Sequence, residues 1–265
     1  MVWDSCRVQF SAIEIVAHRG GPDEGDEPLP EHSLAAYLRA IDCGADALEF
    51  DVRLTADGHL VCIHDRRVDR TSNGRGVVST MTLAQLQSMD FGDERDAHDR
   101  TRSGVLTLDT LLDAAMSRSS TIRFAIETKH PSRYGGDVER ALLATLQRHA
   151  LDAQRVRIMS FSALAIGRVR RLAPQLPRVL LMEYVMWWQR GGRLPGRPDA
   201  VAVSVELIRR HPNYVPLLLE RGHPVHVWTV DDPGDVLMCA QLGASVIITN
   251  RPGLAREVLK RAELQ

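Results

Sequence analysis

The repeated alternation of short β-branched segments with helical patterns is the feature that most constrains how this chain can fold. Segments that predict strands recur along the sequence, and segments that predict helices lie between most of them. Strands joined by helices form right-handed βαβ units and therefore a parallel sheet. About eight such units in 265 residues favour a closed (β/α)8 TIM barrel over a doubly wound sheet.

The individual elements can be placed by these patterns. We predict strands at 13–18, 47–52, 59–64, 122–129, 156–161, 178–182, 200–205, 225–230 and 245–250. We predict helices at 31–43, 107–117, 137–150, 162–172, 212–221, 233–242 and 253–263, with Gly44 and Gly243 ending two of them. Residues 183–199 form a long connection, and residues 66–106 form an insertion after the second strand. We therefore expect one domain over residues 1–265, an α/β barrel with a small insertion.

The overall charge argues against polyanionic partners. The formal net charge is −1, and 44% of the residues are hydrophobic. This balance gives no reason to expect binding to nucleic acid or to an anionic membrane. The first 17 residues contain acids and no adequate apolar run, so we expect neither a signal peptide nor stable membrane insertion. A cytoplasmic location is the default expectation, and the oligomeric state stays open.

Acidic side chains on two predicted strands share one face. In "ALEFDV", Leu48, Phe50 and Val52 suit the helix-facing side, so Glu49 and Asp51 point into the barrel. The same alternation in "RFAIETK" points Glu127 and Lys129 inward. Buried carboxylates need a neutralising partner, and oxygen-only ligation suits a hard cation. We expect Glu49, Asp51 and Glu127 to bind a divalent cation, Mg²⁺ or Ca²⁺.

Two histidines end strands at the same predicted mouth. His18 ends the first strand and faces inward, and His64 ends "HLVCIH" immediately before Asp65. The carboxyl ends of the strands form the face on which barrel active sites lie. If the histidines are left aside, ion pairs within the barrel, such as Glu127 with Lys129, could also explain why charged residues point inward. The convergence of carboxylates with two histidines favours a catalytic site instead.

Several motifs together resemble those of a known family of enzymes. They are "HRG" at 18–20, "PEHS" at 30–33, "GADALEFDVRLTADGHLVCIHD" at 44–65, "IETK" at 126–129, "VWTVD" at 227–231 and "GASVIITNRP" at 243–252. In this combination they resemble the glycerophosphodiester phosphodiesterases, over about residues 13–255. The resemblance implies a (β/α)8 barrel and metal-dependent hydrolysis of a small-molecule glycerophosphodiester to sn-glycerol 3-phosphate and an alcohol.

The resemblance also implies roles for individual residues. Glu49, Asp51 and Glu127 match the metal ligands, and His18 and His64 match the acid–base pair. Arg19 and Lys129 match phosphate-binding cations. Such cations and a metal ion can neutralise a phosphodiester while two imidazoles move protons. The sequence leaves open which histidine is the base, and whether water or the neighbouring glycerol hydroxyl attacks.

The chain departs from the family pattern at two positions. His32 stands where the family usually has Asn, and we expect it to bind the substrate or a metal ligand. Asn250 stands where the family usually has Asp at the end of the last strand. Trp228 alternates inward in "VHVWTV", and we expect it to line the substrate pocket rather than pack in the core.

Two other functions stay open at this point. A phospholipase D-like enzyme acting on lysophospholipids would use the "MWW" segment at 186–188 to hold an acyl chain. A catalytically silent barrel would bind glycerophosphodiesters without turnover. The complete set of candidate catalytic residues argues against the silent barrel.

Overall fold

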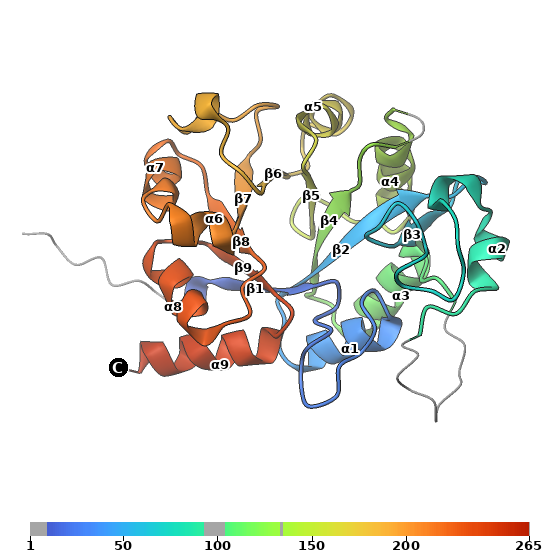
Figure 1. The fold of residues 1–265 in the computed structure, drawn as a ribbon, viewed down its shortest axis with the longest axis horizontal. Helices are drawn as coiled ribbons and strands as arrows, with labels where there is room; N and C mark the ends of the chain where they lie inside the picture. Colours follow the sequence, from blue (N-terminus) through green and yellow to red (C-terminus); the bar gives the residue numbers. More distant parts are fainter. Residues whose placement is uncertain (1–9, 93–103, 133–134, 265) are drawn as a thin grey trace, which may run out of the picture.

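The computed structural model describes residues 10–92, 104–132 and 135–264, and its centre is a closed barrel of eight parallel strands (Figure 1). Neighbouring strands pair around the ring, and pairing of the first strand with both the second and the last closes it. The barrel strands are β1 Glu14–His18, β2 Ala47–Leu54, β4 Arg123–Thr128, β5 Val156–Ser160, β6 Arg178–Met182, β7 Ala200–Ser204, β8 Val225–Trp228 and β9 Val246–Thr249. The predicted TIM barrel is confirmed.

Helices surround this barrel, so that each strand is covered on its outer side. Those that follow barrel strands are α1 Leu34–Asp42, α3 Leu108–Arg118, α4 Asp137–Arg148, α5 Ala163–Leu172, α6 Val205–Arg210, α7 Tyr214–Glu220, α8 Pro233–Gln241 and α9 Pro252–Glu263. One-turn 3-10 helices occupy Phe10–Ala12, Val78–Thr80 and Trp187–Gln189. Among the described residues, no helix combines the length and the apolar character needed to cross a membrane.

Local signals explain where several helices begin and end. The Ser33 hydroxyl accepts a hydrogen bond from the Ala36 N–H and so caps α1. Gly44 and Gly243 follow α1 and α8 with φ of +87° and +91°, a conformation that favours glycine. The short helix α6 was not predicted. Ser204 ends β7 and also caps α6 by accepting from the Leu207 N–H, so no loop separates the two elements.

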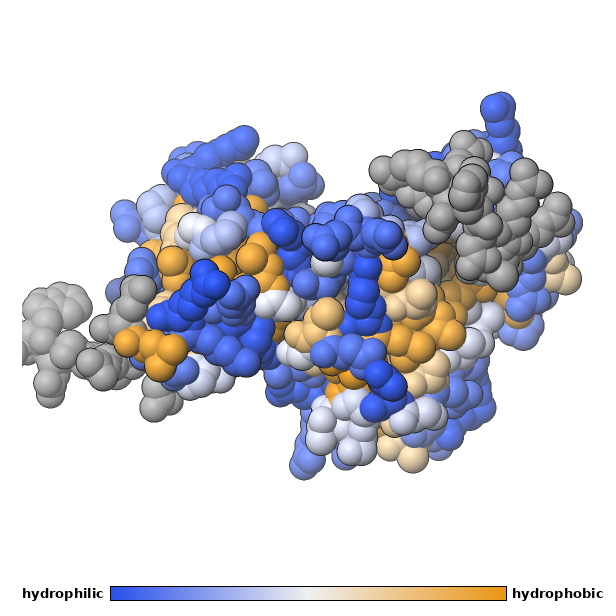
Figure 2. Space-filling view, turned by 90° about the horizontal axis from the view of Figure 1, so that it is seen from below, coloured by the Kyte–Doolittle hydropathy of each residue, from blue (hydrophilic) through white to orange (hydrophobic). Residues whose placement is uncertain are grey.

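Side-chain alternation on the strands divides the core into two layers. The outward residues, such as Leu48, Phe50 and Val52, pack under the helices. The inward residues fill the barrel with small and medium apolar side chains, among them Val16, Ala125 and Met159. Figure 2, which shows the molecule from the side of α9 and α1, has hydrophilic residues over much of the surface with apolar residues gathered between them.

The segment after β2 forms a small structure of its own beside the barrel mouth. Strand β3, Leu60–Cys62, pairs antiparallel with the end of β2, and α2, Leu83–Gln87, follows it. Val61, Val68 and Leu86 belong to a separate apolar cluster under this segment. Part of the predicted 66–106 insertion, residues 93–103, lies outside the described residues. This hairpin carries His64 to the barrel mouth.

Candidate active site

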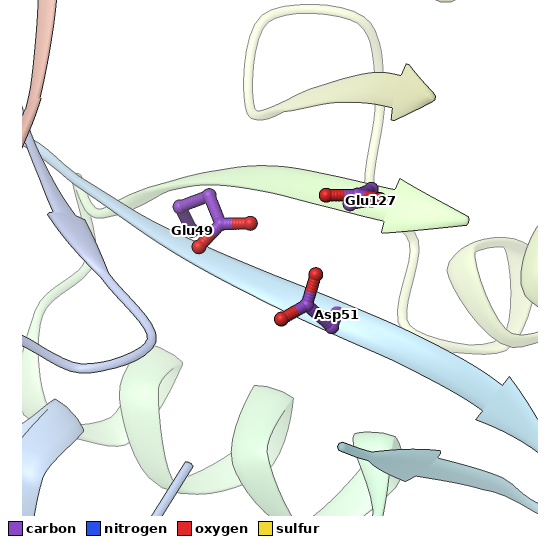
Figure 3. A group of neighbouring side chains, drawn as sticks. All are labelled: Glu49, Asp51 and Glu127. Carbon is purple, nitrogen blue, oxygen red and sulfur yellow. The ribbon is translucent and has the colours of Figure 1, made fainter. Parts of the chain in front are cut away.

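Three carboxylates meet at the mouth of the barrel. Glu49 and Asp51 lie two residues apart on β2, and the parallel register places Asp51 beside Glu127 on β4. Figure 3 shows the three side chains pointing toward one another from these two strands. Each offers an oxygen atom, and the three oxygens lie within 4.8 Å of one another. All three side chains are buried.

The protein neutralises these carboxylates unequally. Burial alone would raise the pKa of Asp51, but Lys129, His32 and Arg19 together hold it well below its usual range. Burial, followed by repulsion from Asp51, raises the pKa of Glu127 to about 8. The same two causes raise the pKa of Glu49 well above its usual range. The cluster therefore holds more negative charge than its protein cations balance.

This surplus of negative charge fits a divalent cation. Glu49 Oε2 accepts only a backbone N–H bond, from Arg19 at 3.1 Å, among the interactions of the described residues. Carboxylate oxygens are the ligands that hard cations prefer, and three of them converge here. Lys129 Nζ binds Asp51 Oδ1 at 2.9 Å and Glu127 Oε1 at 2.7 Å, so the ion pair considered as an alternative is also present.

His32 lies behind Asp51 rather than in the substrate cavity. Its Nε2 is 3.0 Å from Asp51 Oδ2, and its Nδ1 is 2.7 Å from the Tyr37 hydroxyl. The side chain is buried, and both ring nitrogens have partners. Of the two roles that the sequence left open for His32, contact with a metal-ligand candidate matches the geometry, and direct substrate binding does not.

The two candidate catalytic histidines have different partners. His18 is held by Asn250, whose side-chain oxygen lies 2.8 Å from His18 Nδ1. Asn250 is itself fixed by Asp231, which accepts from its side-chain amide at 2.9 Å and from its backbone N–H at 2.7 Å. His64 Nδ1 instead lies 2.7 Å from Asp65 Oδ1. Burial lowers the pKa of both imidazoles, that of His18 to about 3.

A cavity of about 460 Å³ joins these groups. Among the residues that line it are His18, Arg19, Glu49, His64, Glu127, Lys129 and Trp228. Trp228 donates from its indole N–H to the Ala202 carbonyl at 3.2 Å and packs edge-on against Phe161 at 5.5 Å between ring centroids. The structure thus places every predicted site residue except His32 and Asp51 on the wall of one cavity. Asp51 does not line the cavity, but it forms an ion pair with Lys129, which does.

Arg19 and Lys129 lie beside the carboxylates rather than apart from them. Arg19 Nε is 3.3 Å from Asp51 Oδ2, and Arg19 NH1 is 3.4 Å from Glu31 Oε2. The backbone of Arg19 has a φ of 50°, which turns the chain so that its N–H faces Glu49. Both cations are therefore within reach of a phosphate bound next to the cluster.

The cavity wall also contains residues that were not predicted for the site, among them Arg53, Phe161 and Glu183. Arg53 continues the inward alternation of Glu49 and Asp51, and its guanidinium donates to the His64 carbonyl at 2.8 and 3.0 Å. That alternation could have identified Arg53. Phe161 is the last residue of the predicted strand 156–161, and Glu183 follows the predicted strand 178–182. Only their position at strand ends signalled a role.

The aromatic segment after β6 does not reach this cavity. Tyr184, Met186 and Trp187 are exposed, and none of them lines the catalytic cavity. The side chain of Trp188 lies outside the described residues. The acyl-chain grip expected for a lysophospholipid enzyme therefore has no counterpart among the described residues of this cavity.

Comparisons with known proteins identify relatives over most of the chain. Residues 18–254 match the glycerophosphoryl diester phosphodiesterase family. The "Probable glycerophosphodiester phosphodiesterase 1" of Mycobacterium tuberculosis is 42% identical over 258 residues, covering 93% of this chain and 92% of that protein. The glycerophosphodiester phosphodiesterase of Bacillus subtilis is 31% identical over 94% of this chain and 87% of its own length.

A solved structure supports the fold independently. A phosphodiesterase from Oleispira antarctica, in complex with the product sn-glycerol-3-phosphate, superposes with a TM-score of 0.82 over 95% of this chain and 99% of that one. Its sequence identity is 20%, so this likeness supports the barrel alone. Taken with the match over most of the sequence, the chain belongs to the glycerophosphoryl diester phosphodiesterase family and is a hydrolase.

Proposed function

We propose that this protein hydrolyses glycerophosphodiesters to sn-glycerol 3-phosphate and an alcohol, with Mg²⁺ or Ca²⁺ as its metal. The observation that carries the proposal is the meeting of three buried carboxylate oxygens within 4.8 Å, beside two histidines in one cavity. The names of the relatives and the product in the Oleispira antarctica complex support this substrate class.

Glu49, Asp51 and Glu127 would hold the cation. When bound, a divalent ion supplies positive charge that stabilises the phosphoryl oxygens as negative charge builds on them. The residues of the chain add to this effect. When a bound cation neutralises the carboxylates, the Lys129 ammonium can donate to one phosphate oxygen and the Arg19 guanidinium to another. Trp228 and Phe161 form part of the cavity wall and pack edge-on against each other.

The partners of the two histidines support different proton roles. Asn250 accepts from His18 Nδ1–H, which leaves the lone pair of His18 Nε2 free to take a proton. Asn250 is neutral, so it gives an imidazolium less support than a carboxylate would. His64 has the Asp65 carboxylate as its partner, and that favours the protonated ring. We assign His18 as the general base toward the attacking oxygen and His64 as the general acid toward the leaving alkoxide.

A panel of substrates and metals tests the activity itself. Glycerophosphocholine, glycerophosphoethanolamine and a lysophosphatidylcholine are each incubated with Mg²⁺, Ca²⁺, Mn²⁺ or a chelator, and release of sn-glycerol 3-phosphate is measured. We expect release from the glycerophosphodiesters with metal and its loss with the chelator. Turnover of the lysolipid alone, or tight binding without turnover, would contradict the proposal.

The acid and base roles can be separated with a leaving group that needs no proton. The variants His64→Ala and His18→Ala are compared on glycerophosphocholine and on glycerol phosphate p-nitrophenyl ester. Loss of a general acid matters less when p-nitrophenolate leaves, so His64→Ala should recover about 10²-fold on the nitrophenyl ester. His18→Ala should lose activity equally on both. Recovery in His18→Ala instead would reverse the assignment.

The cytoplasmic location, the absence of nucleic-acid partners and the single-domain organisation stay predictions. The phospholipase D-like and catalytically silent alternatives are not favoured, because the family and the relatives named above are phosphodiesterases of glycerophosphodiesters.

A further inference from the structure

A second cavity adjoins the catalytic one on the same face of the barrel. Its volume is about 830 Å³, and its walls come from the carboxyl ends of β6, β7 and β8 together with α6 and α7. Two residues line both cavities, Glu183 after β6 and Trp228 at the end of β8. A molecule bound at the histidines can therefore extend past Trp228 into this second space.

The sizes of the two cavities suggest how a diester would divide between them. The catalytic cavity, at about 460 Å³, has room for a glycerol and a phosphate group. The second cavity, at about 830 Å³, is in the range that accommodates drug-sized ligands. A small amino alcohol would fill little of it. The larger, variable half of the substrate, its alcohol, fits the second cavity.

The charges on the wall narrow the chemistry of that alcohol. Glu183 and Glu206 supply carboxylates, and Arg190 and Arg210 supply guanidiniums, all on exposed side chains. A cationic alcohol would gain from the carboxylates but would be repelled by the arginines, and an anionic one would meet the reverse. Hydroxyl groups can donate to carboxylates and accept from guanidiniums at once, so a neutral alcohol with many hydroxyls suits both.

Apolar and aromatic groups complete the wall. Tyr214 is buried and donates from its hydroxyl to the Gln189 carbonyl at 3.2 Å, which fixes its ring at the cavity. Leu217, on the same helix, is half-buried and also lines the space. These groups offer contact to the C–H faces of a ring that carries hydroxyls at its edge.

Resting on the proposed function, we infer that the second cavity binds the alcohol half of the substrate, and that this alcohol is a bulky neutral polyol of the cyclitol or hexose class. The assignment makes Glu206, Arg210 and Leu217 specificity residues that act on the leaving half without touching the reacting atoms. Its consequence is a preference between glycerophosphodiesters rather than a change in the chemistry.

The first test compares substrates on the metal-loaded wild-type protein. Glycerophosphoinositol, a diester of a cyclic polyol, is measured against glycerophosphocholine. We expect kcat/KM for the inositol diester to be higher by about tenfold, since each well-formed contact to the alcohol adds discrimination of that order. Equal or greater kcat/KM for glycerophosphocholine would overturn the polyol assignment and leave the proposed function standing. Turnover of neither would contradict the proposed function itself.

The second test fills the cavity. Leu217→Trp should raise KM for glycerophosphoinositol about tenfold and change kcat/KM for glycerophosphocholine less than about twofold. Leu219→Trp is the matched control, because Leu219 lies on the same helix but is exposed and does not line the cavity. An equal loss on both substrates in Leu217→Trp, or no loss on either, would contradict the inference.

A third variant keeps the test decisive if tryptophan disturbs the packing of α7. Arg210 is exposed on α6, so Arg210→Ala removes one donor from the wall without opening the core. We expect a selective rise of about threefold to tenfold in KM for glycerophosphoinositol. Unchanged KM for both diesters in Arg210→Ala would count against the cavity as the alcohol site.

Discussion

Two groups of charged residues lie on the axis of the barrel, one at its mouth and one at its floor. At the floor, Glu14 of β1 reaches across to Arg157 of β5, and both carboxylate oxygens meet the guanidinium, at 2.8 and 2.9 Å. At the mouth, Glu49, Asp51 and Glu127 share two cations, Arg19 and Lys129. The floor is balanced within the protein, and the mouth is not.

The difference separates stability from function. The bidentate pair between Glu14 and Arg157 occupies both carboxylate oxygens of Glu14 and ties two distant strands together. The mouth instead keeps two carboxyl groups, Glu49 and Glu127, whose pKa values burial and a neighbouring carboxylate raise. Such an arrangement costs folding free energy unless a cation is bound. Carboxylates that the protein does not fully neutralise are expected at a site that binds a metal ion and a substrate, and the mouth is the face that barrels use for catalysis.

Removing a carboxylate at the mouth should have the largest effect, and it should fall on activity. Glu49→Gln keeps the shape of the side chain but removes one candidate metal ligand. We expect kcat/KM to fall about a thousandfold, or about 4 kcal/mol of transition-state stabilisation. The melting temperature of the metal-free protein should stay the same or rise, because repulsion among the carboxylates decreases. Steady-state kinetics and thermal unfolding measure the two effects.

A matched substitution guards against a general effect of losing a glutamate. Glu220 is exposed at the end of α7, so Glu220→Gln should leave both kinetics and melting temperature unchanged. A loss of activity in Glu49→Gln below about tenfold would remove Glu49 from the metal site.

In the metal-free protein, the raised pKa of Glu127 at the mouth should make the free energy of unfolding fall as the pH rises. The pKa of Glu127 is raised from 4.5 to about 8, so the folded protein holds this proton more tightly than the unfolded chain does. The resulting stabilisation is complete below about pH 4 and is lost as the pH rises through about 8. In chelator, the free energy of unfolding should fall by up to about 4 kcal/mol between about pH 5 and pH 8.

Urea unfolding at several pH values measures this slope. Saturating Mg²⁺ or Ca²⁺ should reduce it, because a cation stabilises the ionised carboxylates that the folded protein otherwise disfavours. A metal-free protein whose stability rises over that pH range would show that the mouth is already balanced by its own cations.

Removing the ion pair at the floor should lower the free energy of unfolding and leave the catalytic activity nearly unchanged. Among the ion pairs of the described residues, Arg157→Met leaves Glu14 with the longer contact to Arg123 Nε, at 3.6 Å. Loss of one partner of a partly buried ion pair should cost about 3 kcal/mol of unfolding free energy. Urea denaturation measures that cost, and kcat/KM of the folded enzyme should change less than about twofold.

An exposed ion pair provides the control for the floor. Arg261 pairs with Glu257 on the surface of α9, so Arg261→Met should cost less than about 0.5 kcal/mol. If Arg157→Met abolished activity in protein that remains folded, the ion pair at the floor would contribute to catalysis as well as to stability.

The sequence predicted the barrel because its signals are local and repeated. Every barrel strand overlaps a predicted one, since each strand segment is largely apolar and most are separated from the next by a helical pattern. The convergence of Glu49, Asp51 and Glu127 was also predictable, because strand alternation and parallel register place them together. The helix α6 was missed because Ser204 serves both β7 and the helix cap, with no turn residues between.

Features that depend on contacts between distant elements could not be predicted. His32 sits in a turn with a φ of 60°, and only the packing of that turn against β2 brings its ring to Asp51. Arg53 follows the alternation, but the hairpin that returns His64 decides where its guanidinium binds. The second cavity is formed by the ends of three strands and two helices, and no local pattern fixes the space between them.

The smallest effect should come from a residue that reaches the metal site only through His32. Asp51 accepts hydrogen bonds, so His32 Nε2 carries the proton that it donates, and in the neutral ring Nδ1 then accepts from the Tyr37 hydroxyl. Tyr37→Phe removes that donor and loosens the orientation of His32 and Asp51. We expect the Kd for Mg²⁺ or Ca²⁺, measured by calorimetry, to rise about tenfold.

Tyr214→Phe is the matched control, because Tyr214 is also buried and loses one hydroxyl hydrogen bond, to the Gln189 carbonyl. Its metal affinity should equal that of the wild type. An unchanged Kd in Tyr37→Phe would mean that Asp51 keeps its position without the hydrogen bond from Tyr37 to His32. The ion pairs of Asp51 with Arg19 and Lys129 would then be enough to orient it, and the mouth would be more like the floor, where ion pairs fix the carboxylate.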